Sequence, residues 1–490
     1  MNKTISVFLV AALAAIGQTA TYTVEALPES KQARVTVLIT KGESSKEFRM
    51  PAWAPGDYEI FDYGKKIESV KFFKDGQEVA GVQGDDPNLW TVEGGATKAV
   101  YTVNESRGNF SPNLRVTEDE MFVSGPGVLG WFSGHAKEEH SLYIRHLGEG
   151  SKAACALDPL EASQGYTGYH AVDYDELIDS PFVVGKNVRV HSFMVEGKPH
   201  AIVGYNKSEN VDLKQYEQNA TKLAIEAKKL FGELPYDRYY FLFDFGGPGG
   251  GLEHLDSTKI GLSPRSTARQ ALSIMSHEYF HTFNVKRIRS QPLGPFDYTK
   301  PAVTGALWWL EGVTDYYADV LAYRGGLIDR AQFLKEMTGA ISGLSRNNAR
   351  LAVSADESSR RVWETRWSNG FGGLSYYTKG KNVGIALDLA IRAYSGNENS
   401  LDDVMRQLYA ECMKGPGFSE TRIREICIEY GGQNLGPIYD QCVYQAVEMP
   451  FNTIFQISGL AMTPQGISEN TNVPAGTQLI GKVWPNALAP

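Results

Sequence analysis

The sequence predicts an α+β protein of several domains, with a β-rich beginning and a mostly helical remainder. Up to about residue 203, short alternating runs such as ARVTVLI are separated by turns, which is the pattern of half-buried strands. From Asp212 onward, apolar residues recur at steps of three and four, which is the period of an amphipathic helix. A chain of 490 residues is also long enough to bury more than one core.

The beginning of the chain has the features of an export signal. Lys3 supplies a basic start, and residues 5–16 form an almost unbroken apolar run that is followed by small residues. A helix needs about 20 apolar residues to cross a bilayer, and this run is shorter. We therefore expect residues 1–20 to be a signal peptide and the mature protein to be secreted or periplasmic, with no membrane association after cleavage.

Charge and cysteine content narrow the classes of partner. Lys and Arg number 48 against 57 Asp and Glu, and no stretch is basic enough to neutralise a run of phosphates, so we expect no nucleic-acid partner. An exported chain meets oxidising conditions, but the four cysteines allow three pairings, and both a disulfide and buried free thiols stay open. The sequence does not indicate an oligomeric state.

Strand patterns fill residues 21–203 at a spacing that is typical of a β-sandwich-like domain. The runs are short, alternate apolar with polar residues and end in turn-forming residues. Asp75 and Gly76 stand between two such runs and predict a tight hairpin turn. We therefore expect an N-terminal β domain.

The pattern changes in the next part of the chain. Residues 213–231 have helical periodicity and end at Gly232, and the apolar strand YYFLFDF then leads into a glycine-rich loop. A long helix is expected to begin near Pro264, after a second short strand. A further helix is expected over about residues 304–322, so this part mixes strands with helices.

Helices dominate the remaining chain. One is expected over residues 330–345, directly after Asp329, and residues 380–448 contain three more helical stretches between glycine-rich breaks. The last forty residues return to a β-like pattern that includes NVPAGTQLIGKV. The helical part therefore lies between two regions with strand character.

A candidate metal site lies within the helix that begins near Pro264. His277 and His281 are four residues apart, so one face of the helix carries both imidazoles within reach of a single tetrahedral Zn²⁺. Glu278 would lie beside the metal, where it can take a proton from a zinc-activated water. Glu311 on a later helix would complete a His₂Glu set, and Asp315 could hold one ligand imidazole. This combination predicts zinc-assisted hydrolysis of an amide.

A glycine-rich loop precedes this helix. Gly250 and Gly251 have no side chain, so their backbone can approach a ligand closely and could pair with a peptide beside an edge strand. Glu253 follows, and a carboxylate near the zinc would bind the α-ammonium group of a substrate. These residues predict a peptide substrate with a free N-terminus, which is the substrate of an aminopeptidase.

The sequence resembles the glycyl aminopeptidase family of zinc metallopeptidases, in the gluzincin group, over nearly its whole length. The resemblance rests on HEYFHTFNVKRIR (277–289), LWWLEGVTDYYADV (307–320), GGGLEH (249–254), YTKG (377–380), MPAWAPGDYEI (50–60) and DYDELIDSPF (173–182). It implies His277, His281 and Glu311 as zinc ligands, Glu278 as general base, Glu253 as the residue that holds the substrate amine, and Tyr377 as a donor to the oxyanion.

The resemblance also implies an architecture, namely an N-terminal β domain, a thermolysin-like HExxH catalytic domain with a helical extension, and a partial PDZ-like C-terminal segment. Phe283 stands where the family usually has Trp, a change that leaves the expected ligands untouched. The expected parts are a signal peptide (1–20), the N-terminal β domain (21–203), the zinc catalytic domain (204–327), a helical subdomain (328–450) and the partial PDZ-like segment (451–490).

The expected function is that of a zinc-dependent aminopeptidase that removes small N-terminal residues, Gly and Ala, as members of that family do. Two alternatives stay open. A zinc endopeptidase would have a cleft open at both ends and would cleave an N-acetylated peptide as well as the free one. A non-catalytic, zinc-stabilised peptide-binding protein would keep the metal without turnover, although it would have no need of Glu278 as a base.

Overall fold

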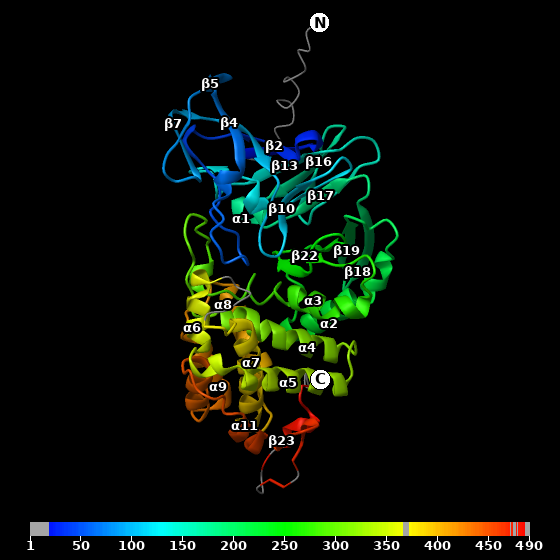
Figure 1. Cartoon of the computed structure of the whole chain (residues 1–490), viewed down its shortest axis with the longest axis vertical. Coiled ribbons are helices and arrows are strands. Elements are labelled where there is room, and N and C mark those ends of the chain that lie inside the picture. The colour runs from blue at the N-terminus through cyan, green and yellow to red at the C-terminus, as the bar shows by residue number, and fades with distance from the viewer. Residues whose placement is uncertain (1–18, 366–371, 471, 474–476, 478, 486–490) are drawn as a thin grey trace.

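The computed structural model describes residues 19–365, 372–470, 472–473, 477 and 479–485. All but the last two residues of the expected signal peptide lie outside the described part. The chain forms an elongated body with β-sheets at one end, helices at the other and a mixed region between them (Figure 1). The predicted α+β class, with a β-rich N-terminal domain and a helical C-terminal part, is confirmed.

Three sheets build the N-terminal domain around one apolar core. Alternating residues such as Val35 and Val37 point into that core, where they meet Leu114 and Trp90 from the two other sheets. The strands of the three sheets, in spatial order, are β15 (Asp158–Leu160), β16 (Tyr166–Ala171), β13 (His140–Arg145), β1 (Ala20–Leu27), β2 (Gln32–Ile39), β8 (Lys98–Asn104), β4 (Ile67–Lys74) and β5 (Gln77–Val79); β14 (Lys152–Ala154), β17 (Phe182–Gly185), β11 (Glu120–Val123), β10 (Pro112–Val116) and β9 (Ser106–Arg107); and β12 (Trp131–Phe132), β3 (Ser45–Arg49), β7 (Leu89–Ala96) and β6 (Val82–Gln83).

The predicted hairpin turn joins β4 to β5. Lys74 pairs with Gln77, and the two residues between them, Asp75 and Gly76, have φ angles of 51° and 79°. Positive φ at both central positions matches the right-handed twist of the flanking strands. The turn expected from the sequence is therefore confirmed.

A mixed sheet occupies the middle of the molecule. Its spatial order is β18 (Arg189–Val195), β19 (Lys198–Tyr205), β20 (Tyr239–Asp244), β22 (Ser257–Gly261) and β21 (Gly250–Glu253). β19, β20 and β22 run parallel, whereas β21 is antiparallel and lies at the edge. β18 and most of β19 precede residue 204, so this sheet begins within the range expected for the β domain.

The two faces of the mixed sheet pack against different parts of the molecule. On one face, Phe241 and Phe243 contact aromatic rings of the helical layer, with Phe241 stacked on Tyr279 at 5.9 Å between ring centroids. On the other face, Leu242 joins an apolar cluster with Phe122 of the N-terminal domain. The alternation of a strand thus places the sheet, and its edge strand β21, between the helices and the N-terminal domain.

Most helices lie on the expected segments, but the helix expected near Pro264 begins at Ala268, and residues 380–448 contain a fourth helix, Leu435–Val443, that the sequence did not predict. Gly232, with a φ of 90°, ends α2 as predicted, and the Asp329 side chain caps α5 by accepting a hydrogen bond from the Gln332 amide. The helices are α1 (Tyr174–Ile178), α2 (Glu217–Phe231), α3 (Ala268–Phe280), the π-helical turn η7 (Trp308–Val313), α4 (Thr314–Arg324), α5 (Arg330–Arg346), α6 (Ala355–Arg360), α7 (Tyr376–Tyr394), α8 (Leu401–Cys412), α9 (Arg422–Gly431), α10 (Leu435–Val443) and α11 (Phe451–Ser458).

The C-terminal segment packs onto the helical part (Figure 1). It begins with α11 and continues as a hairpin of β23 (Leu460–Thr463) and β24 (Gly466–Glu469), followed by the 3₁₀ turn η10 (Ile480–Lys482). Trp484 is buried and donates a hydrogen bond from its indole nitrogen to the Tyr316 hydroxyl at 2.8 Å. The β-like pattern expected here holds for the hairpin, whereas α11 and η10 depart from it. A PDZ-like identity for this segment stays a prediction.

The question of the cysteines, which the sequence left open, has an answer in the structure. All four are buried free thiols. Burial raises the pKa of Cys155 to about 12, so its thiol stays protonated at neutral pH.

Within the described residues, no helix combines the length and the apolar character needed to cross a membrane.

Candidate metal centre and active site

Helix α3 holds the two predicted metal-binding histidines. It begins with a capping box, in which the Thr267 side chain accepts from the Gln270 amide and the Gln270 side chain accepts from the Thr267 amide. Its apolar face, with Met275 and Tyr279, is buried against the mixed sheet and α4. The remaining face therefore carries polar side chains toward a cavity, as the sequence predicts.

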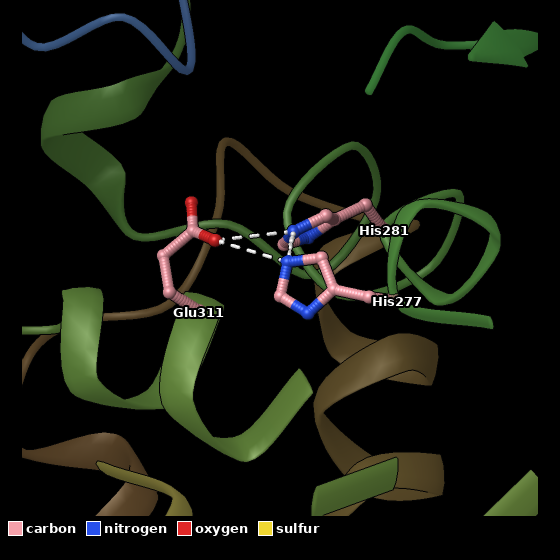
Figure 2. A group of neighbouring side chains, drawn as sticks. All are labelled: His277, His281 and Glu311. Carbon is pink, nitrogen blue, oxygen red and sulfur yellow. Dashed lines mark hydrogen bonds and ion pairs between the residues drawn. The ribbon is translucent and has the colours of Figure 1, made fainter. Parts of the chain in front are cut away.

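Three side-chain atoms converge at the end of α3 (Figure 2). The Nε2 atoms of His277 and His281 lie 3.0 Å apart. One carboxylate oxygen of Glu311 lies 3.1 Å from Nε2 of His281 and 3.7 Å from Nε2 of His277. Two imidazoles and a carboxylate that face one point are the donor set of a His₂Glu zinc site, so these residues fit the metal. The structure thus brings the three predicted ligands together.

The outer nitrogens of both histidines face fixed acceptors. Nδ1 of His277 lies 2.8 Å from a carboxylate oxygen of Asp315, and Nδ1 of His281 lies 2.7 Å from the backbone carbonyl of Asn284. Such partners leave each Nε2 atom free to bind a metal. Asp315 was expected in this position. Asn284 was not expected, because its contribution is a backbone oxygen and a loop conformation that residue spacing does not encode.

Glu311 lies on an unusual helical turn. The sequence predicts an ordinary helix here, but η7 is π-helical before α4 begins. A Cβ atom on Gly312 would collide with the Cα atom of Gly380, so two glycines let η7 and α7 cross at close range. This crossing brings the carboxylate of Glu311 and the ring of Tyr377 to the same cavity. π-helical turns occur often at functional sites.

The electrostatics of the metal ligands follow from their mutual proximity. Burial alone would lower the pKa of His277, but the carboxylates of Asp315 and Glu311 raise it well above the ordinary value. Burial alone would raise the pKa of Glu311, but His281 and His277 hold it well below the ordinary value. Glu311 is therefore ionised at neutral pH and can act as an anionic ligand.

Glu278 lies beside the three ligands, as predicted. Burial raises the pKa of its carboxyl group to about 7, and Glu253 and Glu311 add to that rise, whereas His277 and His281 oppose it. One of its oxygens accepts no hydrogen bond from the described residues. A carboxyl group with a pKa near neutrality and a free oxygen can both accept and release a proton during turnover.

The edge strand β21 carries the glycines and Glu253. A Cβ atom on Gly251 would collide with the Glu278 carboxylate, so a larger residue at that position would have to displace the Glu278 side chain. The side chain of Glu253 is buried, and its carboxylate lies within 4.8 Å of ligand atoms of Glu278 and His281. Because β21 pairs only with β22 among the described strands, its other edge is available to a peptide.

Tyr377 is the second residue of α7 and is in the position implied by the resemblance. Its ring lies 6.0 Å from that of His277, between centroids. Burial, followed by the charge of Glu311, raises the pKa of its phenol well above the ordinary value. The hydroxyl group therefore stays protonated and can donate a hydrogen bond. Spacing alone could not have selected this residue among 25 tyrosines.

A cavity of about 400 Å³ connects all of these side chains. It contains every site residue that the sequence predicted, including Gly250 and Gly251. It also contains three residues of the N-terminal domain that the sequence analysis missed, Gly56, Asn109 and Phe110. No residue spacing points to them, because they are separated from α3 by more than 150 positions in the chain.

Comparisons with known proteins agree with this geometry. The family model described as M61 glycyl aminopeptidase matches residues 270–383, and the Peptidase M61 N-terminal domain matches residues 21–186. No curated protein matches the sequence. Together the two family models cover more than half of the chain, including most of α3 and all of η7.

Solved structures share the fold. An aminopeptidase N family protein from Idiomarina loihiensis has a TM-score of 0.82 at 23% identity, over 90% of this chain and 78% of that chain. An M1 zinc metallopeptidase from Deinococcus radiodurans has a TM-score of 0.55 at 13% identity, over 89% and 95%. Yeast LTA4 hydrolase has a TM-score of 0.56 at 11% identity, over 89% and 68%. With the two family matches and the converging His₂Glu set, the chain belongs to the M61 glycyl aminopeptidase family and is a metallopeptidase.

Proposed function

We propose that the protein is a zinc-dependent aminopeptidase that removes small N-terminal residues, Gly and Ala, from peptides. The observation that carries the proposal is the position of Glu253 in the cavity of the His₂Glu set. A metal site alone suits any metallopeptidase. An additional buried carboxylate beside it suits a substrate that brings a positive charge, which is the α-ammonium group of a free N-terminus.

In this proposal, His277, His281 and Glu311 hold the zinc ion. When bound there, zinc lowers the pKa of a water molecule and polarises the substrate carbonyl. Asp315 and the backbone of Asn284 keep the two imidazoles in the orientation that this binding needs. The donor set and its outer contacts support zinc over metals that prefer oxygen-only sites.

Three other side chains act on the substrate. Glu278 accepts a proton from the attacking water and passes it to the leaving amine. Tyr377 donates a hydrogen bond to the oxygen of the attacked carbonyl as negative charge develops there. Glu253 binds the α-ammonium group and so fixes the scissile bond one residue from the N-terminus.

The N-terminal domain comes close to the amine anchor. A Cβ atom on Gly56 would lie 3.1 Å and 3.2 Å from the two carboxylate oxygens of Glu253, so the backbone of the N-terminal domain approaches the amine anchor closely. That approach and the glycyl aminopeptidase family support a preference for Gly and Ala. The M1 peptidase from D. radiodurans has been solved as a mutant bound to a Tyr-Ser-Ala substrate, which supports a peptide as the class of substrate.

The test compares a Gly- or Ala-initiated tripeptide with its N-acetylated twin, with and without a chelator. We expect release of the first residue from the free peptide only, loss of activity with the chelator and recovery with zinc. Cleavage of both twins would favour the endopeptidase alternative. Cleavage of neither by the zinc-loaded protein would favour a peptide-binding protein.

A variant of the amine anchor tests the observation itself. Glu253→Gln removes the charge and keeps the shape of the side chain. We expect KM for the free tripeptide to rise by at least about tenfold, because a charge-assisted hydrogen bond becomes a neutral one. Zinc content should stay at one ion per chain. Loss of zinc would instead identify Glu253 as a ligand or a structural residue.

We also propose that the protein is exported. The support is the basic and apolar character of residues 1–20, which lie almost wholly outside the described part. The test is the mass of the protein recovered from the periplasm or medium of an expressing bacterium. A chain that keeps Met1 and remains in the cytoplasm would contradict this proposal.

A further inference from the structure

One wall of the metal cavity is formed by a loop of the N-terminal domain. Residues 108–111 connect β9 to β10, and the amide of Gly108 donates to the carbonyl of Ser111 at 2.8 Å, which closes the turn. Phe110 is in this turn, is partly exposed and lines the cavity. In Figure 1 the loop next to β10 descends toward β22. An aromatic ring from another domain thus lies in the active-site cavity.

Two buried ionisable side chains fix the backbone on either side of this ring. Both carboxylate oxygens of Asp57 accept from the amide of Asn109 at 3.2 Å. The ammonium group of Lys259, on β22, donates to the carbonyl of Phe110 at 3.2 Å. Both anchoring side chains are buried, at 2% and 0% exposure, so water does not compete effectively for these bonds. The position of Phe110 is therefore set by both domains.

The order of groups along β21 shows which part of a substrate faces the ring. Glu253, the amine anchor, is at the end of the strand. Gly251 lies against Glu278, the proposed base, two positions earlier. Gly250 comes one position before that, and a Cβ atom on it would lie 3.8 Å from Cδ1 of Phe110, in ordinary van der Waals contact. Amine anchor, base and ring thus follow one another along the edge strand.

A peptide that pairs with this edge has the same repeat as the strand, about 3.3 Å per residue. If its N-terminus is at Glu253 and its first carbonyl is near Glu278, its second residue lies beside Gly250 and Phe110. Neither Gly250 nor Gly251 has a side chain, and among the described residues the ring of Phe110 is what a Cβ atom on Gly250 would contact, so this ring is an apolar surface that the second residue meets.

We infer that Phe110 forms the wall of a subsite for the side chain of the second substrate residue, directly after the scissile bond, and that this subsite selects apolar side chains. The inference rests on the proposed aminopeptidase function and deepens it. It adds a class of substrate, namely peptides with a small first residue and an apolar second residue. Burying an apolar side chain against an aromatic ring is favourable because both surfaces leave water.

The test measures kcat/KM for tripeptides Ala-X-Ala in which X is Gly, Ala, Leu or Phe. For the zinc-loaded wild type we expect X = Leu to exceed X = Gly by about tenfold or more, since hydrophobic pockets discriminate by about 10- to 200-fold. Phe110→Ala should reduce this Leu-to-Gly ratio at least about fivefold. Phe110→Leu, which keeps an apolar side chain, should retain most of the ratio.

The chain offers a matched control in Phe73. It lies on β4, is also partly exposed and does not line the cavity. Phe73→Ala should leave the whole X profile as in the wild type. A second series, Ala-Ala-X, tests the position, and we expect it to respond less than twofold to Phe110→Ala.

Three results would overturn the inference. The first is a wild-type profile that is flat in X, the second is an unchanged Leu-to-Gly ratio in Phe110→Ala, and the third is a response to Phe110→Ala that appears only in the Ala-Ala-X series. All three leave release of the first residue from free peptides intact, so they are distinct from a failure of the proposed function. In that failure, no tripeptide would lose its first residue, or the N-acetylated twins would be cleaved equally well.

Discussion

Glu278 differs from an ordinary surface carboxylate, because burial and two neighbouring carboxylates raise its pKa to about 7. We predict that Glu278→Gln retains zinc and lowers kcat by about 10²- to 10⁴-fold, the range that a general base contributes. The proposed ligands His277, His281 and Glu311 stay in place, so the metal content measured by atomic absorption should equal that of the wild type. Unchanged kcat would remove Glu278 from the mechanism, and an empty site would make it structural.

Asp57 holds the Phe110 loop, and its raised pKa predicts a contribution to stability that depends on pH. Burial raises its pKa to about 7, the Asn109 hydrogen bonds oppose that rise, and the nearby carboxylates of Glu59 and Glu253 add to it. The folded protein therefore keeps a proton that the unfolded chain releases near pH 4. The contribution of Asp57 to the free energy of unfolding should therefore fall as pH rises from about 4 to about 7, and stay level above that range.

Asp57→Asn cannot titrate, so it should lack this contribution. The free energy of unfolding of the variant minus that of the wild type should rise by a few kcal/mol from pH 5 to pH 8, since each pKa unit corresponds to about 1.4 kcal/mol. The measurement is urea unfolding of the chelator-treated proteins at several pH values. Parallel curves for the two proteins would show that Asp57 titrates normally.

At the scale of helices and strands, the crossing of η7 and α7 positions Glu311 and Tyr377. We predict that Gly312→Ala separates the two elements, because the new Cβ atom would collide with Gly380. Overpacking of this kind costs about 1–3 kcal/mol, and a displaced ligand should weaken zinc binding by at least about tenfold. Thermal melting and a competitive zinc titration measure the two effects.

A glycine elsewhere in the helical part provides the control for that substitution. Gly343 lies within α5, and a Cβ atom on it would meet no other atom within 4 Å. Gly343→Ala should leave zinc affinity unchanged and raise stability by up to about 1 kcal/mol, because alanine has the better helix propensity. Equal effects of the two substitutions would refute a special role for the crossing.

The same elements show what the sequence could and could not predict. His277 and His281 follow from the helical repeat, the turn at Asp75 from local residue preference, and the end of α2 from Gly232, because each depends on neighbours in the chain. Asn284 and Phe110 act through loop geometry and contacts over long sequence separations, which spacing does not encode. The close approach of the π-helical turn at Glu311 to α7 likewise depends on Gly380, almost 70 residues away.

At the scale of the whole molecule, one of the contacts between the N-terminal domain and the rest of the chain lies next to the amine anchor. Asp179, at the end of α1, lies 2.9 Å from the ammonium group of Lys286 and 3.1 Å from Nδ1 of His254, and it accepts from the Leu255 amide at 2.9 Å. Burial alone would raise the pKa of Asp179, but Lys286 and His254 hold it below the ordinary value. One partly buried carboxylate thus joins the N-terminal domain to the residues that follow Glu253 and to Lys286.

We predict that Asp179→Ala lowers the free energy of unfolding by about 3–5 kcal/mol, because it leaves the charge of Lys286 buried without its partner. KM for a free tripeptide should rise as well, since the segment that carries Glu253 loses its attachment to the N-terminal domain.

Asp119, which pairs with Lys186 at 3.1 Å on the surface, provides the control. Asp119→Ala should change the free energy by less than about 1 kcal/mol and leave KM unchanged. Urea unfolding and steady-state kinetics on both variants measure these effects. A loss of stability in Asp179→Ala without any rise in KM would show that this contact stabilises the protein but does not position Glu253 for substrate binding.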